Sequence, residues 1–498
     1  MPPAGAGASA SGGGPLAPAA GNGLSVGTQT GGPVGTGGVA GGAATTVAPG
    51  LSEPGNSAPF SRSSGSTSGL GSGAFVARGV TASTITIGVQ YAGDATQGNA
   101  AAGASHIQLA DPTKTTDILV NEINAHGGVA GRKLQVSYFV TQDDSATPYA
   151  TQAQSECADF TQDHPAFLVI DTDLSVTIFA RPCLARAGVP EIIIGQAFSS
   201  SRDYAQYPLE VDPQLFSFER IYATLIPTLA SENWFTPWNR ITGAAAATGK
   251  AKCGVVSFDY GSFANVLGST VLPGLRSEGC PVAAADVIEV TTPASSGEDG
   301  ATVSQIQGAV LKLDQDGVDH VILLDPNGSL DLFFLNDAYS QRYFPRYGGT
   351  SGNLWQTLIG SGDVQPQTLN GAEGIGWIPL LDVPYTSQGA EATPARSSCF
   401  QLMRNNGNPP TAGSTAFQLA ASCDVFFFVQ HTLDRVHRRI TPAEYLSAVN
   451  STGQFTSAET RDLTLGAQQH DGITDFWDMS YSSNCQCVVY RGGGQRAQ

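Results

Sequence analysis

The most regular alternation of apolar and polar segments lies in residues 166–201. The apolar run 167–170 is long enough for one buried strand, and the polar loop 171–175 follows it. Apolar residues then recur at the 3.6-residue spacing of a helix until Gly188, a residue typical of helix C-termini. The β-branched run 192–194 comes next. This pattern predicts two parallel strands joined by a helix, with a right-handed crossover.

The same strand–helix rhythm recurs along most of the chain. A long apolar helix is expected at 415–436, packed into the first half of the fold. Further strands are predicted at 84–89, 134–140, 215–218, 254–258, 282–290, 321–324, 348–350, 372–380 and 485–490. Two successive runs of alternating strand and helix predict an α/β protein with two doubly wound, mainly parallel sheets. Ligands of such sheets bind beyond the carboxyl ends of the strands, so the polar loops 171–175 and 195–201 are the first candidates for a site.

The N-terminal residues 1–75 have a different composition. They are almost entirely Gly, Ala, Ser, Pro and Thr, with few large apolar side chains. Such a segment buries too little apolar surface to offset the entropy lost on ordering, so we expect a flexible tether. The remaining ~420 residues suit two lobes of ordinary domain size.

The charge of the chain narrows its range of partners. Asp and Glu number 42 against 24 Lys and Arg, which gives a formal net charge of −18. A surface of that sign repels phosphate backbones, so nucleic acid is not expected as a partner. No apolar run approaches the ~20 residues that a membrane-spanning helix needs.

The eight cysteines fall into neighbouring pairs along the chain. These pairs are Cys157/Cys183, Cys253/Cys280, Cys399/Cys423 and Cys485/Cys487. The even number and local spacing predict disulfides in an oxidising compartment, although eight buried thiols are the alternative. The first residues show neither the basic nor the apolar region of a secretory signal. We therefore expect an exported protein whose signal is not visible in this sequence.

Motifs for catalysis and for metals are not found in the sequence. It has no dinucleotide-binding glycine pattern opening a helix after the first strand, no phosphate-binding Walker loop and no nucleophile elbow. The segment 325–331 spaces oxygen ligands like a calcium loop, but Leu330 stands where the sharp-turn Gly belongs. We expect no enzymatic activity, no cofactor and no metal.

Several stretches together resemble the type 1 periplasmic binding proteins. They are GVTASTITIGV at 79–89, HGGVAGRKLQVSYFVTQDD at 126–144, AGVPEIII at 187–194 and GAEGIGWIPLLDVP at 371–384. The leucine/isoleucine/valine-binding group, the solute receptors of ABC importers, is the most similar branch. The resemblance implies two lobes joined by three crossing segments, with the ligand clamped between them. It implies a first lobe of 76–220 with 370–450, and a second of 221–369 with 451–498.

In the first lobe, the resemblance implies three residues that meet the ligand. Ser175 and free N–H groups at its helix start would bind a carboxylate, a role that suits the partial positive charge there. An ordinary helix cap is the alternative for Ser175. Ala197 and Ser199 would bind the ligand's ammonium group.

Three further residues are candidates, and the resemblance implies the first two of them. Tyr260 would close over the ligand from the second lobe, or else pack on its own helix. Glu298, or its neighbour Asp299, would be the acidic partner of the ammonium group. Asp94 is a further possible contact, with a surface charge as the alternative.

These observations predict an extracytoplasmic solute-binding protein, in the periplasm or at the cell surface. It would clamp a small polar solute, an amino acid or an amide-like compound, and deliver it as a monomer to an ABC transporter permease. The alternative is a ligand-sensing or enzymatic domain on the same α/β scaffold. A sensor would normally be fused to membrane-spanning and signalling segments, and an enzyme would need an acid, base or nucleophile that the motifs do not supply.

Removal of residues 1–75 tests the tether. We expect the shortened protein to keep its melting temperature, because the deleted segment contributes no core. Limited proteolysis of the full chain should stop at a stable fragment that begins near residue 76. Loss of the cooperative thermal transition after truncation would show that the segment is part of the fold.

Overall fold

The computed structural model describes residues 77–143, 145–194, 199–386, 393–436, 439–466 and 469–497. The predicted tether and Ala197 lie outside the described residues. From Gly73 onward the chain forms one compact unit. Within the described ranges, none of the helices has the length and apolar character to cross a membrane.

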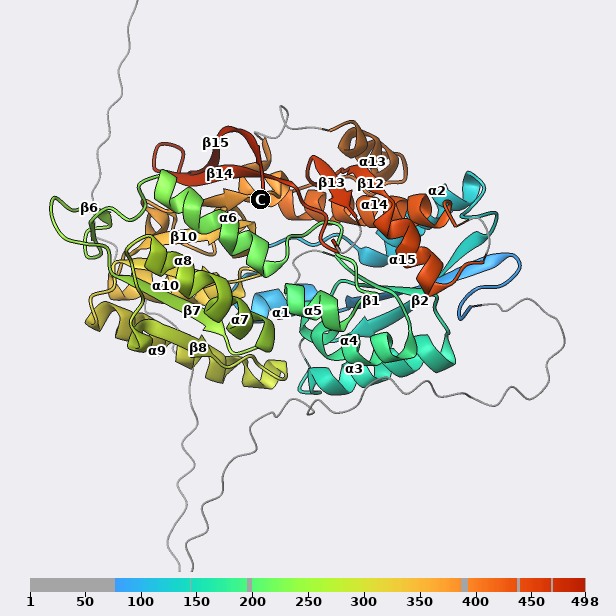
Figure 1. Ribbon diagram of the computed structural model, residues 1–498, viewed down its shortest axis with the longest axis horizontal. Helices are drawn as coiled ribbons and strands as arrows, with labels where there is room; N and C mark the ends of the chain where they lie inside the picture. Colours follow the sequence, from blue (N-terminus) through green and yellow to red (C-terminus); the bar gives the residue numbers. More distant parts are fainter. Residues whose placement is uncertain are drawn as a thin grey trace, which may run out of the picture. The chain divides into compact units, whose positions relative to one another are not determined.

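The first lobe is built on a four-stranded parallel sheet with the order β2-β1-β3-β4 (Figure 1). Its strands are β1 (Thr84–Ala92), β2 (Lys133–Thr141), β3 (Leu168–Asp171) and β4 (Glu191–Ile193). Alternate residues of a strand face opposite sides of a sheet. Leu168 and Ile170 therefore join the core with α2 and α14, whereas Val169 joins the core with α3 and α4.

The helices of this lobe include the longest one in the described chain. They are α1 (Ala95–Ala101), α2 (Pro112–Ala125), α3 (Tyr149–Ala158), α4 (Leu174–Ala187), α5 (Ser201–Gln206), α13 (Pro394–Asn405), α14 (Gly413–Leu433) and α15 (Pro442–Asn450). Gly188 ends α4 in the left-handed conformation, with φ 71°, as its type predicts. The predicted apolar helix at 415–436 corresponds to α14, which is buried against the first sheet.

The second lobe is built on a seven-stranded sheet with the order β15-β14-β11-β10-β9-β7-β8. Its parallel strands are β7 (Cys253–Phe258), β8 (Val287–Val290), β9 (His320–Leu324), β10 (Arg346–Thr350) and β11 (Glu373–Gly376). The hairpin β14 (Asp475–Ser482) and β15 (Cys487–Arg496) extends the sheet on the β11 side in the antiparallel sense. The predicted α/β class with two sheets is confirmed.

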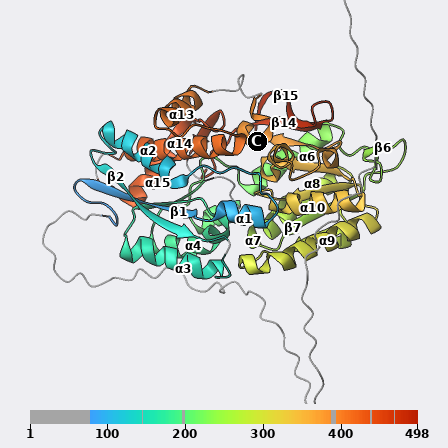
Figure 2. The same ribbon diagram turned by 180° about the vertical axis from the view of Figure 1, so that it is seen from behind.

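Two groups of helices pack on the second sheet (Figure 2). One group is α6 (Phe218–Ser231), α7 (Gly261–Val266) and α8 (Leu272–Ser277), and the other is α9 (Asp299–Gln315) and α10 (Ser329–Gln341). The remaining elements are α11 (Trp355–Ser361), α12 (Pro379–Asp382) and the short hairpins β5 (Trp238–Asn239)–β6 (Ala244–Ala245) and β12 (Gly453–Thr456)–β13 (Asp462–Leu465).

Several sequence-based boundaries differ from the structure. The strands predicted at 282–290 and 372–380 are shorter, at Val287–Val290 and Glu373–Gly376, because a 3-10 turn precedes the first and helix α12 follows the second. The strand expected at 215–218 is wrong, because Phe218 opens helix α6 and the apolar residues before it are buried as irregular chain. A short apolar run fits a buried strand and a buried helix equally well, so its pattern could not decide. The expected boundary at residue 370 assigns the chain that follows it to the first lobe. Strand β11 lies beyond this boundary but pairs with β10, so the second sheet continues past residue 370.

All four predicted disulfides are present in the structure. They join Cys157 to Cys183, Cys253 to Cys280, Cys399 to Cys423 and Cys485 to Cys487. The first three span 24 to 27 residues and connect neighbouring elements of one lobe, such as α3 and α4. The fourth closes the turn between β14 and β15.

Removal of the first disulfide should destabilise the protein strongly. Closing a loop of 26 residues restricts the unfolded chain, so Cys157→Ala with Cys183→Ala should lower the free energy of unfolding by about 3 kcal/mol. Urea denaturation measures this loss. The matched control is Cys485→Ala with Cys487→Ala. These two cysteines are only two residues apart in the sequence, so the loss of stability should be smaller. Equal losses from both double variants would contradict the loop-length argument.

Candidate functional site

A cavity of about 810 Å³ lies between the two sheets, where helices begin beyond the carboxyl ends of the strands. The first lobe contributes the end of α1, the segment after β2 and the start of α4. The second lobe contributes the loops β7–α7, β8–α9 and β9–α10. This is the position at which open α/β sheets bind ligands.

A second cavity of about 700 Å³ adjoins the first one. The two share Asp143, Ser175 and Asn327, so we treat them together and call them the cleft. The second cavity is lined by the loop after β1, by the start of α2 and by Phe417 and Gln418 of α14. The cleft therefore has walls from both lobes along its whole extent.

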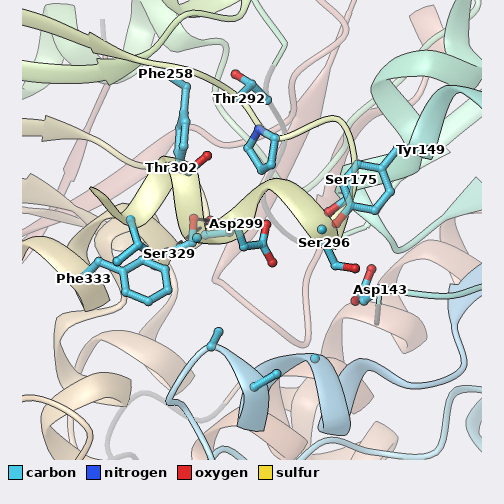
Figure 3. Close-up of a pocket in the computed structure, with 18 of the residues that line it drawn as sticks. Asp143, Tyr149, Ser175, Phe258, Thr292, Ser296, Asp299, Thr302, Ser329 and Phe333 are labelled. Carbon is cyan, nitrogen blue, oxygen red and sulfur yellow. Dashed lines mark hydrogen bonds between the residues drawn. The ribbon is translucent and has the colours of Figure 1, made fainter. Parts of the chain in front are cut away.

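Ser175 lies in the cleft, at the second residue of α4. The cap of this helix is Asp173, whose Oδ1 accepts a hydrogen bond of 3.0 Å from the Ser175 N–H. The capping alternative for Ser175 is therefore wrong, because Asp173 fills that position. Figure 3 shows the Ser175 side chain beside Tyr149, which opens α3.

Ser199 lies away from the cleft, in a buried polar cluster. Only 1% of the residue is exposed. Its hydroxyl donates to Glu210 Oε1 and accepts a bond of 3.1 Å from Arg181 Nη2. It is absent from the described linings of both cavities. The other residue predicted for this loop, Ala197, cannot be placed because it lies outside the described residues.

Tyr260 lines the larger cavity and precedes the first residue of α7. Burial raises its pKa to about 12, against the opposing effect of the nearby Arg181 charge. The phenol therefore stays protonated at neutral pH and offers a neutral hydroxyl together with a ring face.

The acidic candidates occupy different positions. Glu298 is exposed, and its Oε2 accepts a hydrogen bond of 3.0 Å from the Ala294 N–H. Its neighbour Asp299, the first residue of α9, is also exposed but lines the cavity. Asp94 lies just before α1, and its Oδ1 accepts a bond of 2.7 Å from the Asp143 N–H. Asp94 therefore holds the segment of Asp143 in place.

Sequence reasoning missed most of the side chains that line the larger cavity, among them Asp143, Tyr149, Asn327 and Phe333. Asp143 and Asn327 follow predicted strands at their carboxyl ends, the same signal that pointed to Ser175. Applied to every strand, that signal would have found both. Tyr149 and Phe333 belong to helices, and only the packing of the two lobes brings them to the cavity.

Burial raises the pKa of Asp143 to about 8, and the like charges of Asp173 and Asp94 add to this effect. The pKa of Asp173 is also raised, mainly by burial. The Asp173 carboxylate accepts hydrogen bonds from the Thr141 hydroxyl, at 2.5 Å, and from the backbone of α4. The first-lobe wall of the cleft thus concentrates carboxyl groups in a poorly solvated place.

Hydrogen bonds between the lobes cross the rim of the larger cavity. The Tyr149 N–H donates to Ala294 O at 2.8 Å, and Ser296 Oγ donates to Ser145 O at 2.9 Å. A third bond, from Ser262 Oγ to Asp203 Oδ2, measures 2.7 Å. These contacts join the loop before α9 and the start of α7 to the first lobe.

Two α/β lobes that enclose a cavity at their strand ends define the type 1 periplasmic-binding-protein fold, as the sequence resemblance predicted. Neither a family model nor a curated protein matches the sequence. Solved structures match it in fold. A possible leucine/isoleucine/valine-binding protein from Rhodopirellula baltica has a TM-score of 0.56 and 14% identity, covering 82% of this chain and 97% of its own.

Two further structures are similar to this chain at low sequence identity. A solute-binding protein of an ABC transporter from R. palustris, in complex with 4-hydroxybenzoate, has a TM-score of 0.57 and 12% identity, covering 83% and 98% of the two chains. A branched-chain amino acid binding protein from Streptococcus pneumoniae, in complex with isoleucine, has a TM-score of 0.52 and 15% identity, covering 82% and 100%. Proteins of this one fold thus hold chemically different ligands.

The raised pKa of Asp143 predicts a pH dependence of stability. The folded protein holds this proton more tightly than the unfolded chain does, so the free energy of unfolding falls as pH rises from about 4 to about 8. The side chain in Asp143→Asn cannot ionise, so the free energy of unfolding of this variant should fall less over the same range. The difference at the alkaline end should be on the order of 1–3 kcal/mol. Melting temperatures across this pH range measure the difference. Parallel curves for Asp143→Asn and the original protein would contradict it.

Proposed function

We propose that this protein is an extracytoplasmic solute-binding protein that clamps a small polar solute between its lobes. The observation that carries the proposal is the cleft itself, whose walls come from both lobes and lie at the strand ends. The fold likeness to solute-binding proteins supports the same role. Binding would need no chemical step, so we propose no enzymatic activity.

The arrangement of the cleft suits a ligand-controlled clamp. Ser175 and Tyr149 belong to the first lobe, whereas Tyr260 and Asp299 belong to the second. A solute that contacts both walls binds the closed arrangement more tightly than the open one, and so shifts the equilibrium towards closure. The rim hydrogen bonds between Tyr149 and Ala294 and between Ser296 and Ser145 form only when the lobes are together, and would stabilise the closed form.

We propose that the closed protein acts as a monomer and delivers its solute to an ABC transporter permease. The disulfides support a place in an oxidising compartment, the periplasm or the cell surface. An amino acid or an amide-like compound is the proposed class of small polar solute, and the known ligands of the fold add aromatic acids to the compounds worth screening.

Variants at Ser175 and Tyr260 test the site once thermal-shift screening with amino acids, amides and aromatic acids has identified a solute. Ser175→Ala should weaken binding by roughly 1–3 kcal/mol, because it removes a hydrogen bond to a polar or charged group. Tyr260→Ala should weaken binding by at least as much, since it also removes a ring contact. Calorimetry measures both, with Ser269→Ala, an exposed serine of the second lobe, as the control. Unchanged affinity in both variants would place the binding site elsewhere.

A further inference from the structure

Among the described residues, the side chains of the cleft that can carry a charge near neutral pH are all acidic. Asp143 and Asp299 line the larger cavity, and Asp111 and Asp173 line the second one together with Asp143. Among the described residues that line either cavity there is no Lys, Arg or His. The nearest cation to Tyr260, Arg181, is buried and forms an ion pair of 3.0 Å with Glu210. A ligand carboxylate would find no cationic side chain in these linings to pair with.

Helix N-termini are the other feature that binds anions, and at α4 and α10 the protein's own carboxylates occupy them. Asp173 caps α4 and accepts from the Ser175 N–H. Asp325 occupies the start of α10. Its Oδ1 accepts a hydrogen bond of 3.0 Å from the Gly328 N–H, and its Oδ2 accepts one of 2.7 Å from the Asp331 N–H. Asp299 is itself the first residue of α9. At α4 and α10 the donors that favour anions are therefore already engaged, whereas the starts of α7 and α9 have no side-chain cap.

Aromatic rings line the same space as these carboxylates. Tyr149 comes from the first lobe, and Phe258, Tyr260, Phe263 and Phe333 come from the second. The face of an aromatic ring attracts cations through its quadrupole, most strongly where water is excluded. Rings combined with carboxylates are the surroundings that suit an ammonium group with an apolar body.

The two carboxylates of the larger cavity come from different lobes. Figure 3 shows Asp299 and Asp143 around the same space, with Ser296 between them. Asp143 Oδ1 is buried and meets no hydrogen-bond donor among the described residues. A cation placed there would satisfy this oxygen and would draw the walls of the two lobes together.

We propose that the solute of this cleft is an organic cation, an amine or quaternary ammonium compound with an apolar body, rather than a carboxylate. This inference rests on the proposed solute-binding function, and it replaces the amino acid or amide-like compound with an organic cation as the expected solute. The cation binds with its charge between Asp143 and Asp299 and its apolar body against the rings of the second lobe.

Binding of a cation should release a proton. Asp173 at the start of α4, Asp94 before α1 and Asp299 on α9 all face Asp143, and with burial they keep it protonated near neutral pH. A cation beside Asp143 favours its ionised form and so lowers its pKa. Affinity for amines should therefore rise with pH up to about 8, where Asp143 ionises without the ligand.

Isothermal titration calorimetry with matched ligands tests the proposal on the full chain. One series is 3-methylbutylamine, leucine and 4-methylpentanoate, and the other is 2-phenylethylamine, phenylalanine and 3-phenylpropanoate. Within each series the apolar body is the same and only the charged groups differ. We expect the amine to bind at least about tenfold more tightly than the carboxylate. Amine binding should also release protons from the protein, which titrations in buffers of differing ionisation enthalpy measure.

Amide variants identify the groups that carry the preference. Asp143→Asn and Asp299→Asn should each weaken amine binding by about tenfold or more, since each removes a charged partner. Proton release should disappear in Asp143→Asn. The matched control is Glu289→Gln on the exposed side of β8, which should leave amine binding unchanged. Thermal melts of each variant show that it is folded.

Three results of the amine titrations would overturn the cation preference. They are tighter binding of a carboxylate than of its matched amine, no binding of any amine at millimolar concentration, and amine binding that survives Asp143→Asn together with Asp299→Asn. A neutral or anionic solute whose affinity falls in Ser175→Ala and Tyr260→Ala would overturn the cation preference while leaving the solute-binding function intact.

Discussion

The first-lobe wall of the cleft depends on one buried guanidinium group. Arg181 lies on α4, is 1% exposed and forms an ion pair with Glu210, with Ser199 within hydrogen-bond distance. Burial disfavours its charged form, but Glu210 and Glu191 outweigh that effect and keep its pKa above the ordinary value. Loss of this one cation would leave several carboxyl groups without a compensating charge, which is far costlier than loss of a surface ion pair.

The position of Arg181 links the core to the cleft. Its helix begins at the cleft with Asp173 and Ser175, and its Glu210 partner belongs to the segment that leads into α6 and the second lobe. The ion pair therefore fixes where the chain leaves the first sheet. The side chains of Phe417 and Phe455 pack against the cores of both lobes, which gives the lobes shared apolar contacts behind the cleft.

The sequence predicted the elements of this fold better than its cleft. Strands β1 and β9 were predicted close to their observed bounds, β1 from its alternating β-branched residues and β9 from an apolar run that ends at a polar turn. The family resemblance pointed to Ser175 and Tyr260, each of which follows a strand end, and both line the larger cavity. Ser199 satisfies the same pattern, yet its hydroxyl is engaged by Glu210 and Arg181. Local sequence cannot reveal such partners, because they are brought together only by packing.

The disulfide between Cys157 and Cys183 has a consequence for how tightly a ligand can be held. It joins α3 to α4, the two helices whose first turns present Tyr149 and Ser175 to the cavity. The two helices cannot separate, so these side chains keep their relative positions when the cleft is empty. A ligand then loses its own freedom on binding but does not have to order that wall. Formation of this disulfide thus sets the arrangement of that wall before any ligand reaches the cleft.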